Sequence, residues 1–173
     1  MHIRLSISDK TGIGVFLILV CVMCALSGAP SVAASNKVPA DWIALDVGDK
    51  FVLKAPPGSA HVPGQGIDSF VGKIGTPGFT LAFDYGAYSD PLKAQGAYQQ
   101  YRVRQTQIGG KAARIVTAFA PGLSADWPYL IGVHFPNLKR SVVGPVKLTM
   151  SGWVKAPKDY DTAETMFGTI VFK

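Results

Sequence analysis

Cysteine is nearly absent from this chain of 173 residues. The two that it has, Cys21 and Cys24, both lie in one apolar run near the N-terminus. A thiol pair in such a run is removed with an export signal or buried in lipid, so its C-x-x-C spacing does not indicate a metal or redox site. The remainder of the chain cannot form disulfides, and its stability must therefore come from packing.

The patterns that fix a catalytic or metal site are also missing. The sequence lacks the G-x-S-x-G motif that presents the nucleophile of many hydrolases, and it lacks the D-x-D-x-D-G loop that binds calcium. After the N-terminal run it has two histidines, His61 and His134, whereas a zinc site needs three or four ligands. We therefore expect no metal and no cofactor, and no motif assigns a reaction.

Negative charge is scarce as well. The chain has 11 acidic side chains against 17 Lys and Arg, which gives a formal net charge of +6. The basic residues are scattered along the sequence, and they form no Lys/Arg-rich block of the kind that contacts nucleic acid. We expect no nucleic-acid partner.

The N-terminus has the layout of an export signal. Two basic side chains in the first ten residues precede a stretch without charge, residues 11–36, whose first half is densely apolar. A Gly and a Pro then break the run. Small residues follow at Val32 and Ala34, the −3 and −1 positions of a cleavage site. The pattern predicts a signal peptide over residues 1–34 and a periplasmic or secreted protein.

An uncleaved N-terminal segment is the alternative. Residues 11–30 would then anchor the protein in the membrane, and this anchor would be its only contact with lipid. The apolar run is shorter than the roughly 20 residues that a stable span requires, so we favour cleavage.

Apolar runs between Gly- and Pro-rich breaks predict a domain made mostly of strands. The seven strand candidates are residues 50–54, 67–74, 79–85, 98–108, 111–119, 129–135 and 146–154. Gly109 and Gly110 join two of them, and glycine favours a tight hairpin there because it adopts positive φ angles. Apolar side chains alternate in residues 79–85, so the aromatic residues are expected on a buried face and Asp84 on the opposite one. Loops are expected at residues 59–66, 86–96 and 137–140.

The C-terminal residues 161–171 have helical periodicity instead. Asp161 and Glu164 fit a capping box, and one apolar face follows, made of Ala163, Met166, Phe167 and Ile170. We predict an α+β domain: a mostly antiparallel sheet of about seven strands with this helix packed on one face. A β-sandwich or barrel is the alternative. Residues 35–49 are assigned to a tether and lead-in, and residues 50–173 to the domain.

A motif pair suggests a family. Residues 66–72 read GIDSFVG, and residues 83–86 read FDYG, followed by Tyr88 and Ser89. The pair resembles one found in exported bacterial domains of unknown function. The layout over residues 50–172 is similar to the PsbP-like fold of photosystem II extrinsic proteins. This resemblance implies an antiparallel sheet covered by helices and an accessory or assembly role without catalysis, and it supplies no catalytic residues.

Asp84 and His134 stand out because of the strand faces on which they fall. Asp84 is opposite the aromatic face of its strand. It is either solvated there or, if that face is covered, it needs a cation, and Arg104 or Arg114 is available. His134 lies on the thinner and more polar face of its strand, where a structural hydrogen bond is the simpler role.

Trp153 also falls on the polar face of its strand. It indicates either a binding surface or a contact with the segment around Trp42 and Ile43. The candidate binding residues are Asp68, Ser69, Asp84, Tyr85, Tyr88, Arg104, Arg114, His134 and Trp153.

Two functions follow from these observations. The first is a non-catalytic binding or assembly module of the cell envelope, whose partner is an envelope protein or a small ligand. The second is an envelope hydrolase that uses Ser69, His134 and Asp84 as a triad. We favour the first because Ser69 lies outside any nucleophile motif and fits a turn residue better.

Overall fold

The computed structural model describes residues 37–173. The expected signal peptide, the alternative anchor and both cysteines lie outside these residues. No helix within the described part is long and apolar enough to cross a membrane.

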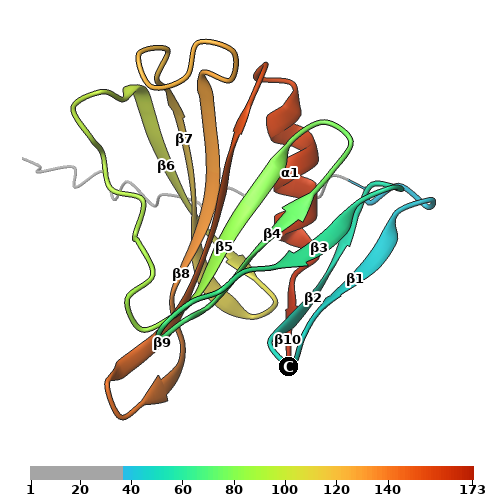
Figure 1. Ribbon diagram of the computed structural model, residues 1–173, viewed down its shortest axis with the longest axis vertical. Coiled ribbons are helices and arrows are strands. Elements are labelled where there is room, and N and C mark those ends of the chain that lie inside the picture. The colour runs from blue at the N-terminus through green and yellow to red at the C-terminus, as the bar shows by residue number, and fades with distance from the viewer. Residues whose placement is uncertain (1–36) are drawn as a thin grey trace, which may run out of the picture. The chain divides into compact units, whose positions relative to one another are not determined.

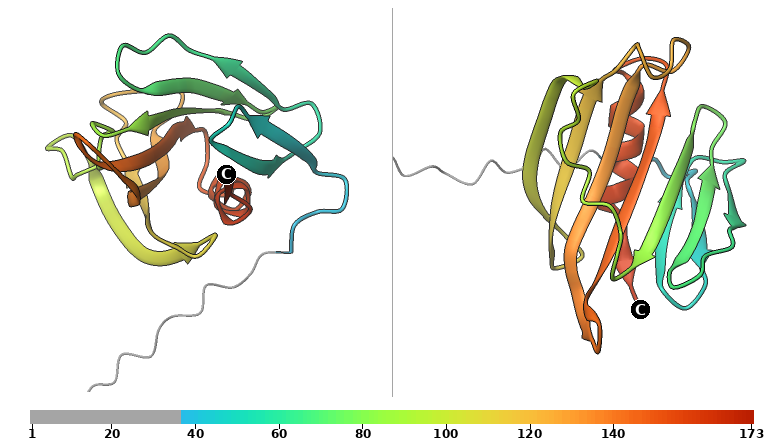
Figure 2. Two further views of the ribbon diagram at one scale, coloured as in Figure 1. Left: turned by 90° about the horizontal axis from the view of Figure 1, so that it is seen from below. Right: turned by 60° about the vertical axis from the view of Figure 1, so that its left-hand side comes forward.

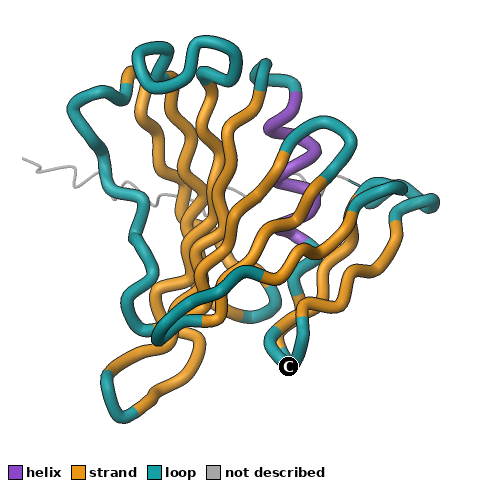
Figure 3. The backbone as a smooth tube through the Cα atoms, viewed as in Figure 1, coloured by secondary structure: helices purple, strands orange, loops and turns teal. Residues whose placement is uncertain are grey.

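Strands dominate this part of the chain, as Figure 3 shows. In sequence order the elements are β1 Ile43–Val47, β2 Phe51–Ala55, β3 Ala60–Pro63, β4 Phe70–Gly75, β5 Thr80–Gly86, β6 Gln99–Ile108, β7 Lys111–Phe119, β8 Tyr129–Ser141, β9 Gly144–Val154, α1 Asp159–Gly168 and β10 Val171–Phe172. The prediction of a mostly antiparallel sheet with a C-terminal helix is confirmed.

The main sheet has seven antiparallel strands in the order β3-β4-β5-β9-β8-β7-β6 (Figure 1). It is open, with β3 and β6 at its two edges, so the barrel alternative is wrong. The aromatic face predicted for β5 is buried, because Phe79, Phe83 and Tyr85 are each less than 9% exposed.

A second sheet joins the two ends of the described chain. Its order is β1-β2-β10, and β2 pairs antiparallel with both neighbours. Residues 43–47 therefore belong to the domain rather than to the lead-in that we assigned. Only Val47 of β1 is fully buried, and β3, inside the expected loop 59–66, has no fully buried side chain, so neither has the apolar alternation by which a half-buried strand is recognised.

The helix α1 lies on the inner face of the curved main sheet (Figure 2). It contacts β2 of the small sheet and β8 of the large one. Phe51, Phe135 and Phe167, from β2, β8 and α1, are fully buried together in one core. Burial of each such side chain stabilises the fold by about 2–3 kcal/mol.

The boundaries of α1 differ from the prediction. It begins at Asp159, its N-cap is Lys158, and no side chain caps it. The predicted capping box is wrong because Asp161 lies in the first turn rather than at the N-cap, and Glu164 forms an ion pair with Arg104. The helix ends at Gly168, since the chain must turn to place Val171 beside β2.

The hairpin predicted at Gly109 and Gly110 is present. Gly109 and Gly110 have φ angles of 56° and 72°, as a tight turn requires. The β8–β9 hairpin is longer than expected, because its turn lies at Val142 and Val143. The basic stretch 137–140, predicted as a loop, is part of β8. Lys139 and Arg140 are exposed, so their charges remain solvated and carry no desolvation penalty in this strand.

Candidate ligand groove

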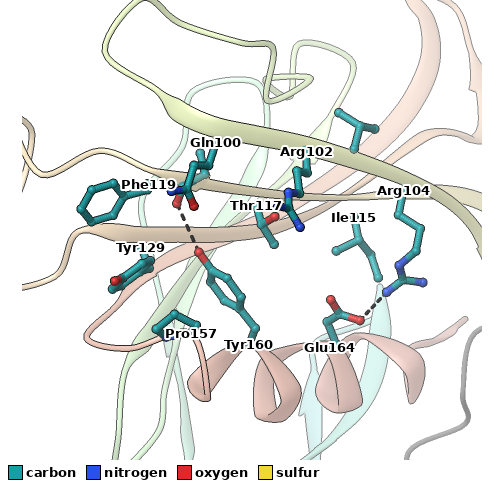
Figure 4. Close-up of a pocket in the computed structure, with 12 residues that line it drawn as sticks. Gln100, Arg102, Arg104, Ile115, Thr117, Phe119, Tyr129, Pro157, Tyr160 and Glu164 are labelled. Carbon is teal, nitrogen blue, oxygen red and sulfur yellow. Dashed lines mark hydrogen bonds and ion pairs between the residues drawn. The ribbon is translucent and has the colours of Figure 1, made fainter.

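A groove lies between the β6–β7 end of the main sheet and α1 (Figure 4). Its volume is about 570 Å³, which is within the range of small-ligand sites. Its lining combines aromatic side chains with a few polar ones. The lining residues are Gln100, Arg102, Val103, Arg104, Ile115, Thr117, Ala118, Phe119, Tyr129, Pro157, Tyr160 and Glu164.

Strand alternation sends two arginines of β6 toward this groove. Arg102 is opposite Thr117 in β7, and Arg104 is opposite Ile115. Side chains two residues apart on a strand share a face, so both guanidinium groups descend toward the helix (Figure 4). The pairing register shifts between Gln99 and Arg102, and the bulge turns Gln100 into the groove with a φ of 50°.

The two arginines differ in their partners. Arg104 is paired with Glu164 of α1 and so connects the strand to the helix. Arg102 is exposed and takes part in no ion pair within residues 37–173. Because Glu164 is the single acidic residue of the lining, the groove keeps one excess positive charge, and Arg102 carries it.

Tyrosines form the other end of the groove. The Tyr160 hydroxyl donates to the Ala118 carbonyl at 3.2 Å, and its ring meets Tyr129 edge-on at 6.2 Å between centroids. Tyr129 in turn packs against Phe119 at 5.0 Å. Burial, with Tyr129 adding to it, raises the pKa of Tyr160 to about 12. Tyr160 therefore stays protonated and cannot serve as a base near neutral pH.

The lining of the groove supplies a limited set of chemical groups. It holds no Ser, Cys, His or Lys side chain, and Glu164 is already paired with Arg104. What the groove offers is a cation, hydrogen-bonding groups and an aromatic wall.

Three of the predicted site residues lie together on the opposite face of the sheet. Asp84 is opposite Thr149, Thr149 is opposite His134, and His134 is opposite Arg114, so the four form one row across β5, β9, β8 and β7. Arg104 is not among them, because it faces the groove. The row is thus separated from the groove by the thickness of the sheet.

A covering segment, residues 87–98, crosses this outer face, and we call it the strap. The Thr149 hydroxyl donates to the Asp90 carbonyl at 2.5 Å, and the Tyr101 hydroxyl donates to the Leu92 carbonyl at 2.8 Å. Leu92 packs on Gly132, where a Cβ would lie 2.5 Å from its Cδ1 atom. The row is therefore covered rather than open to ligands.

His134 has a structural role in this row. Its Nδ1 is 2.8 Å from the Thr149 hydroxyl. Because that hydroxyl donates its hydrogen bond to the Asp90 carbonyl, Nδ1 is the donor in the bond to Thr149. Burial, followed by the charges of Arg114 and Lys147, lowers the pKa of His134 to about 4.

The alternative in which Asp84 pairs with Arg104 or Arg114 is not found among residues 37–173. Arg104 pairs with Glu164, and Arg114 is three strands away, roughly 14 Å at the usual strand spacing. Asp84 Oδ1 and Arg114 Nε and Nη2 are buried without a hydrogen-bond partner among the described residues.

The structure does not bring together the residues of the hydrolase hypothesis. Ser69 precedes β4, whereas His134 is in β8, and β5 and β9 lie between these strands. The separation is roughly 14 Å, far beyond a catalytic hydrogen bond. Nδ1 of His134 forms its hydrogen bond with Thr149 rather than with Asp84.

Close packing explains the glycines of the motif pair. A Cβ on Gly66 would lie 2.2 Å from the Ser69 carbonyl oxygen, and one on Gly86 would lie 2.4 Å from the Ser69 hydroxyl oxygen. A Cβ on Gly72 would lie 2.7 Å from the Phe83 ring. These contacts make the motif a packing feature between β4 and β5, with Asp68 exposed beside it.

The remaining predicted residues are dispersed. Tyr85 is in the core, with the Lys50 ammonium group 5.9 Å from its ring centroid, whereas Tyr88 is 69% exposed. Trp153 lies on the outer face beside Tyr98, at 6.4 Å between centroids. With Trp127 it lines a second, more open cavity of about 480 Å³.

Sequence reasoning missed most of the groove. Arg102, Tyr160 and Glu164 were not chosen as ligand contacts, although two signals were available. Arg102 and Arg104 have the spacing of one strand face, and Tyr160 and Glu164 have the spacing of one helix face. What the sequence could not supply was the placement of this helix beneath this strand.

Comparison of the chain with models of protein families, with characterised protein sequences and with solved structures finds no match.

Proposed function

We propose that this protein is an exported, non-catalytic binding module of the cell envelope, and that its groove binds an anionic group carried on an apolar body. The observation that carries the proposal is the Arg102 guanidinium, which has no ion-pair partner among residues 37–173 and lies beside an aromatic wall in a groove of about 570 Å³. The N-terminal sequence supports export, and the layout that resembles PsbP-like proteins supports an accessory role.

The charge of the ligand follows from the lining. An acidic head group accepts charge-assisted hydrogen bonds from Arg102, and such bonds are worth about 1.5–3 kcal/mol. A cationic ligand would meet the excess positive charge of the groove. The rings of Phe119, Tyr129 and Tyr160 favour a flat or apolar body next to that head group.

A pair of matched probes tests the proposal. Anilinonaphthalene sulfonate carries an aromatic body and an anionic head, and N-phenylnaphthylamine has the same body without the charge. We expect Arg102→Gln to weaken binding of the sulfonate about tenfold or more and to leave binding of the neutral probe unchanged. The control is Arg140→Gln, which removes an exposed charge from the β8–β9 hairpin.

Titration by fluorescence and by calorimetry measures both affinities. The proposal fails if the wild-type protein and the Arg102→Gln variant bind the sulfonate equally well. It also fails if Arg140→Gln weakens binding as much as Arg102→Gln does, because the effect would then reflect net charge alone.

A further inference from the structure

The groove opens beside a free sheet edge. The strand β6 has ten residues and is the last strand of the main sheet, paired within the described residues with β7 alone (Figure 1). The opposite edge, β3, has four residues and ends at Pro63, so it offers little for pairing. Of the two edges, β6 is the one long enough to accept another strand.

The hairpin turn determines which backbone groups of β6 face outward. In a two-residue hairpin the residues that flank the turn, here Ile108 and Lys111, exchange hydrogen bonds with each other. Every second residue back from Ile108 is then bonded to β7, and Arg104 is one of these. The N–H and C=O groups of Val103 and Gln105 therefore point away from the sheet.

The usual protections of a sheet edge are missing from β6. It has no proline, no lysine and no inward-pointing acidic residue. Its register shift lies at one end, between Gln99 and Arg102, and leaves the segment from Arg102 to Ile108 in continuous register with β7. That segment is a regular template for a further strand.

We propose that an extended, acidic segment of a partner protein adds to β6 as a further strand and places a carboxylate side chain against Arg102 in the groove. This inference rests on the proposed function, because it names the carrier of the anionic group. An added strand lies about 4.8 Å beyond β6. Its alternate side chains therefore stand next to those of Arg102 and Arg104, above the groove.

Charge selects a partner segment over a second copy of this chain. The strand β6 contains two arginines and no acidic residue. Pairing two copies edge to edge would bring arginines together, and like charges on neighbouring strands are destabilising. A segment in which acidic residues alternate with small or apolar ones has the opposite charge at the required spacing of two residues.

A short acetylated peptide in which glutamate alternates with threonine is the probe. We expect the purified protein to bind it and Gln105→Pro to weaken binding about tenfold or more, because proline removes one outward N–H and blocks the added strand. The matched control is Gln105→Ala, which removes the same side chain but keeps the N–H and should bind as the wild type does.

A second set of binding measurements changes the peptide instead of the protein. N-methylation of alternate peptide residues removes the N–H groups that would face β6, and we expect it to abolish binding to the wild type. Replacement of glutamate by glutamine in the peptide should weaken binding to the wild type but not to Arg102→Gln. The sulfonate probe serves as the test of folding, because Gln105→Pro should bind it normally.

The outcomes separate the two proposals. If the sulfonate binds through Arg102 but the peptide does not bind, or binds Gln105→Pro and Gln105→Ala equally, the strand-addition inference is overturned and the proposed function stands. If neither probe depends on Arg102, the proposed function itself fails. A dimer that Gln105→Pro dissociates would assign the edge to a second copy and overturn the inference.

Discussion

His134 illustrates how one buried side chain links the stability of this protein to pH. The ring is 4% exposed, and its Nδ1 donates to Thr149, which is itself bonded to the strap. Protonation would place a positive charge in a buried site close to Arg114. The folded protein therefore binds this proton less readily than the unfolded chain does, with a pKa of about 4 against an ordinary value of 6.5.

The sign of the pH effect follows from this difference. The neutral ring is compatible with the fold, so its contribution is fully present above pH 6.5 and is lost as the pH falls toward about 4. We expect the free energy of unfolding of the wild type to decrease by roughly 2–3 kcal/mol over this range on account of His134.

Urea unfolding at several pH values checks this prediction. The variant His134→Gln removes the titrating group, and its unfolding free energy should fall less steeply between pH 6.5 and 4 than that of the wild type. Parallel curves for the two proteins would show that His134 does not contribute to the acid sensitivity.

At the scale of elements, the ion pair between Arg104 and Glu164 connects β6 to α1. Both side chains are partly exposed, with 38% and 29% of their surface accessible, so the pair adds at most about 1 kcal/mol to stability. Its larger effect is on charge, because Glu164 neutralises one of the two arginines that face the groove.

Glu164→Gln should therefore improve anion binding while leaving the fold nearly unchanged. We expect the affinity for the sulfonate probe to rise about twofold to fivefold, because the Arg104 charge becomes available, and the unfolding free energy to change by less than about 1 kcal/mol. Asp161→Asn, a neutralisation on the same helix outside the groove lining, is the control. An equal gain in both variants would refute the assignment.

An element could be predicted where turn residues or an apolar periodicity mark it locally in the sequence. The hairpin at Gly109 and Gly110 and the alternation in β5 were readable because turn residues and periodicity act locally. The strands β1, β3 and β10 were not, since most of their side chains are exposed and give no apolar alternation, unlike the equally short β2. The start of α1 was misplaced because the helix begins two residues before Asp161, at a position that no side chain caps.

The same distinction applies to the site. The face on which Asp84 and His134 fall within their own strands could be read from alternation, but their alignment with Arg114 in one row depends on strand order and register. The groove was missed because it joins residues 60 positions apart, such as Arg104 and Glu164, and no local pattern reports such a contact. The covering of the polar row by the strap was equally invisible in the sequence.

At the scale of the whole molecule, the export prediction concerns residues outside the described part. We expect the mature protein to begin at Ser35, since Val32 and Ala34 form the small-residue cleavage site. A cut after Ala34 removes none of the residues that the structure describes, so the groove would be retained intact.

Mass spectrometry of the intact protein recovered from the periplasm or medium measures this directly. Ala34→Arg, which places a bulky charge at the −1 position, should leave the precursor uncleaved, whereas Ala40→Arg, beyond the cleavage site, should be processed normally. A wild-type protein that retains Met1 would instead support the anchored alternative.

The pairing of β10 with β2 sets a limit on when this domain can finish folding. The segment from Val171 to Lys173 closes the small sheet: the Lys173 N–H donates to the Lys50 carbonyl, and its ammonium group bonds to Asp46 and Gly48. Until this segment is available, α1 is tethered at its N-terminal end alone. A chain that emerges N-terminus first, from a ribosome or a translocation channel, therefore completes this domain only after β10 has emerged.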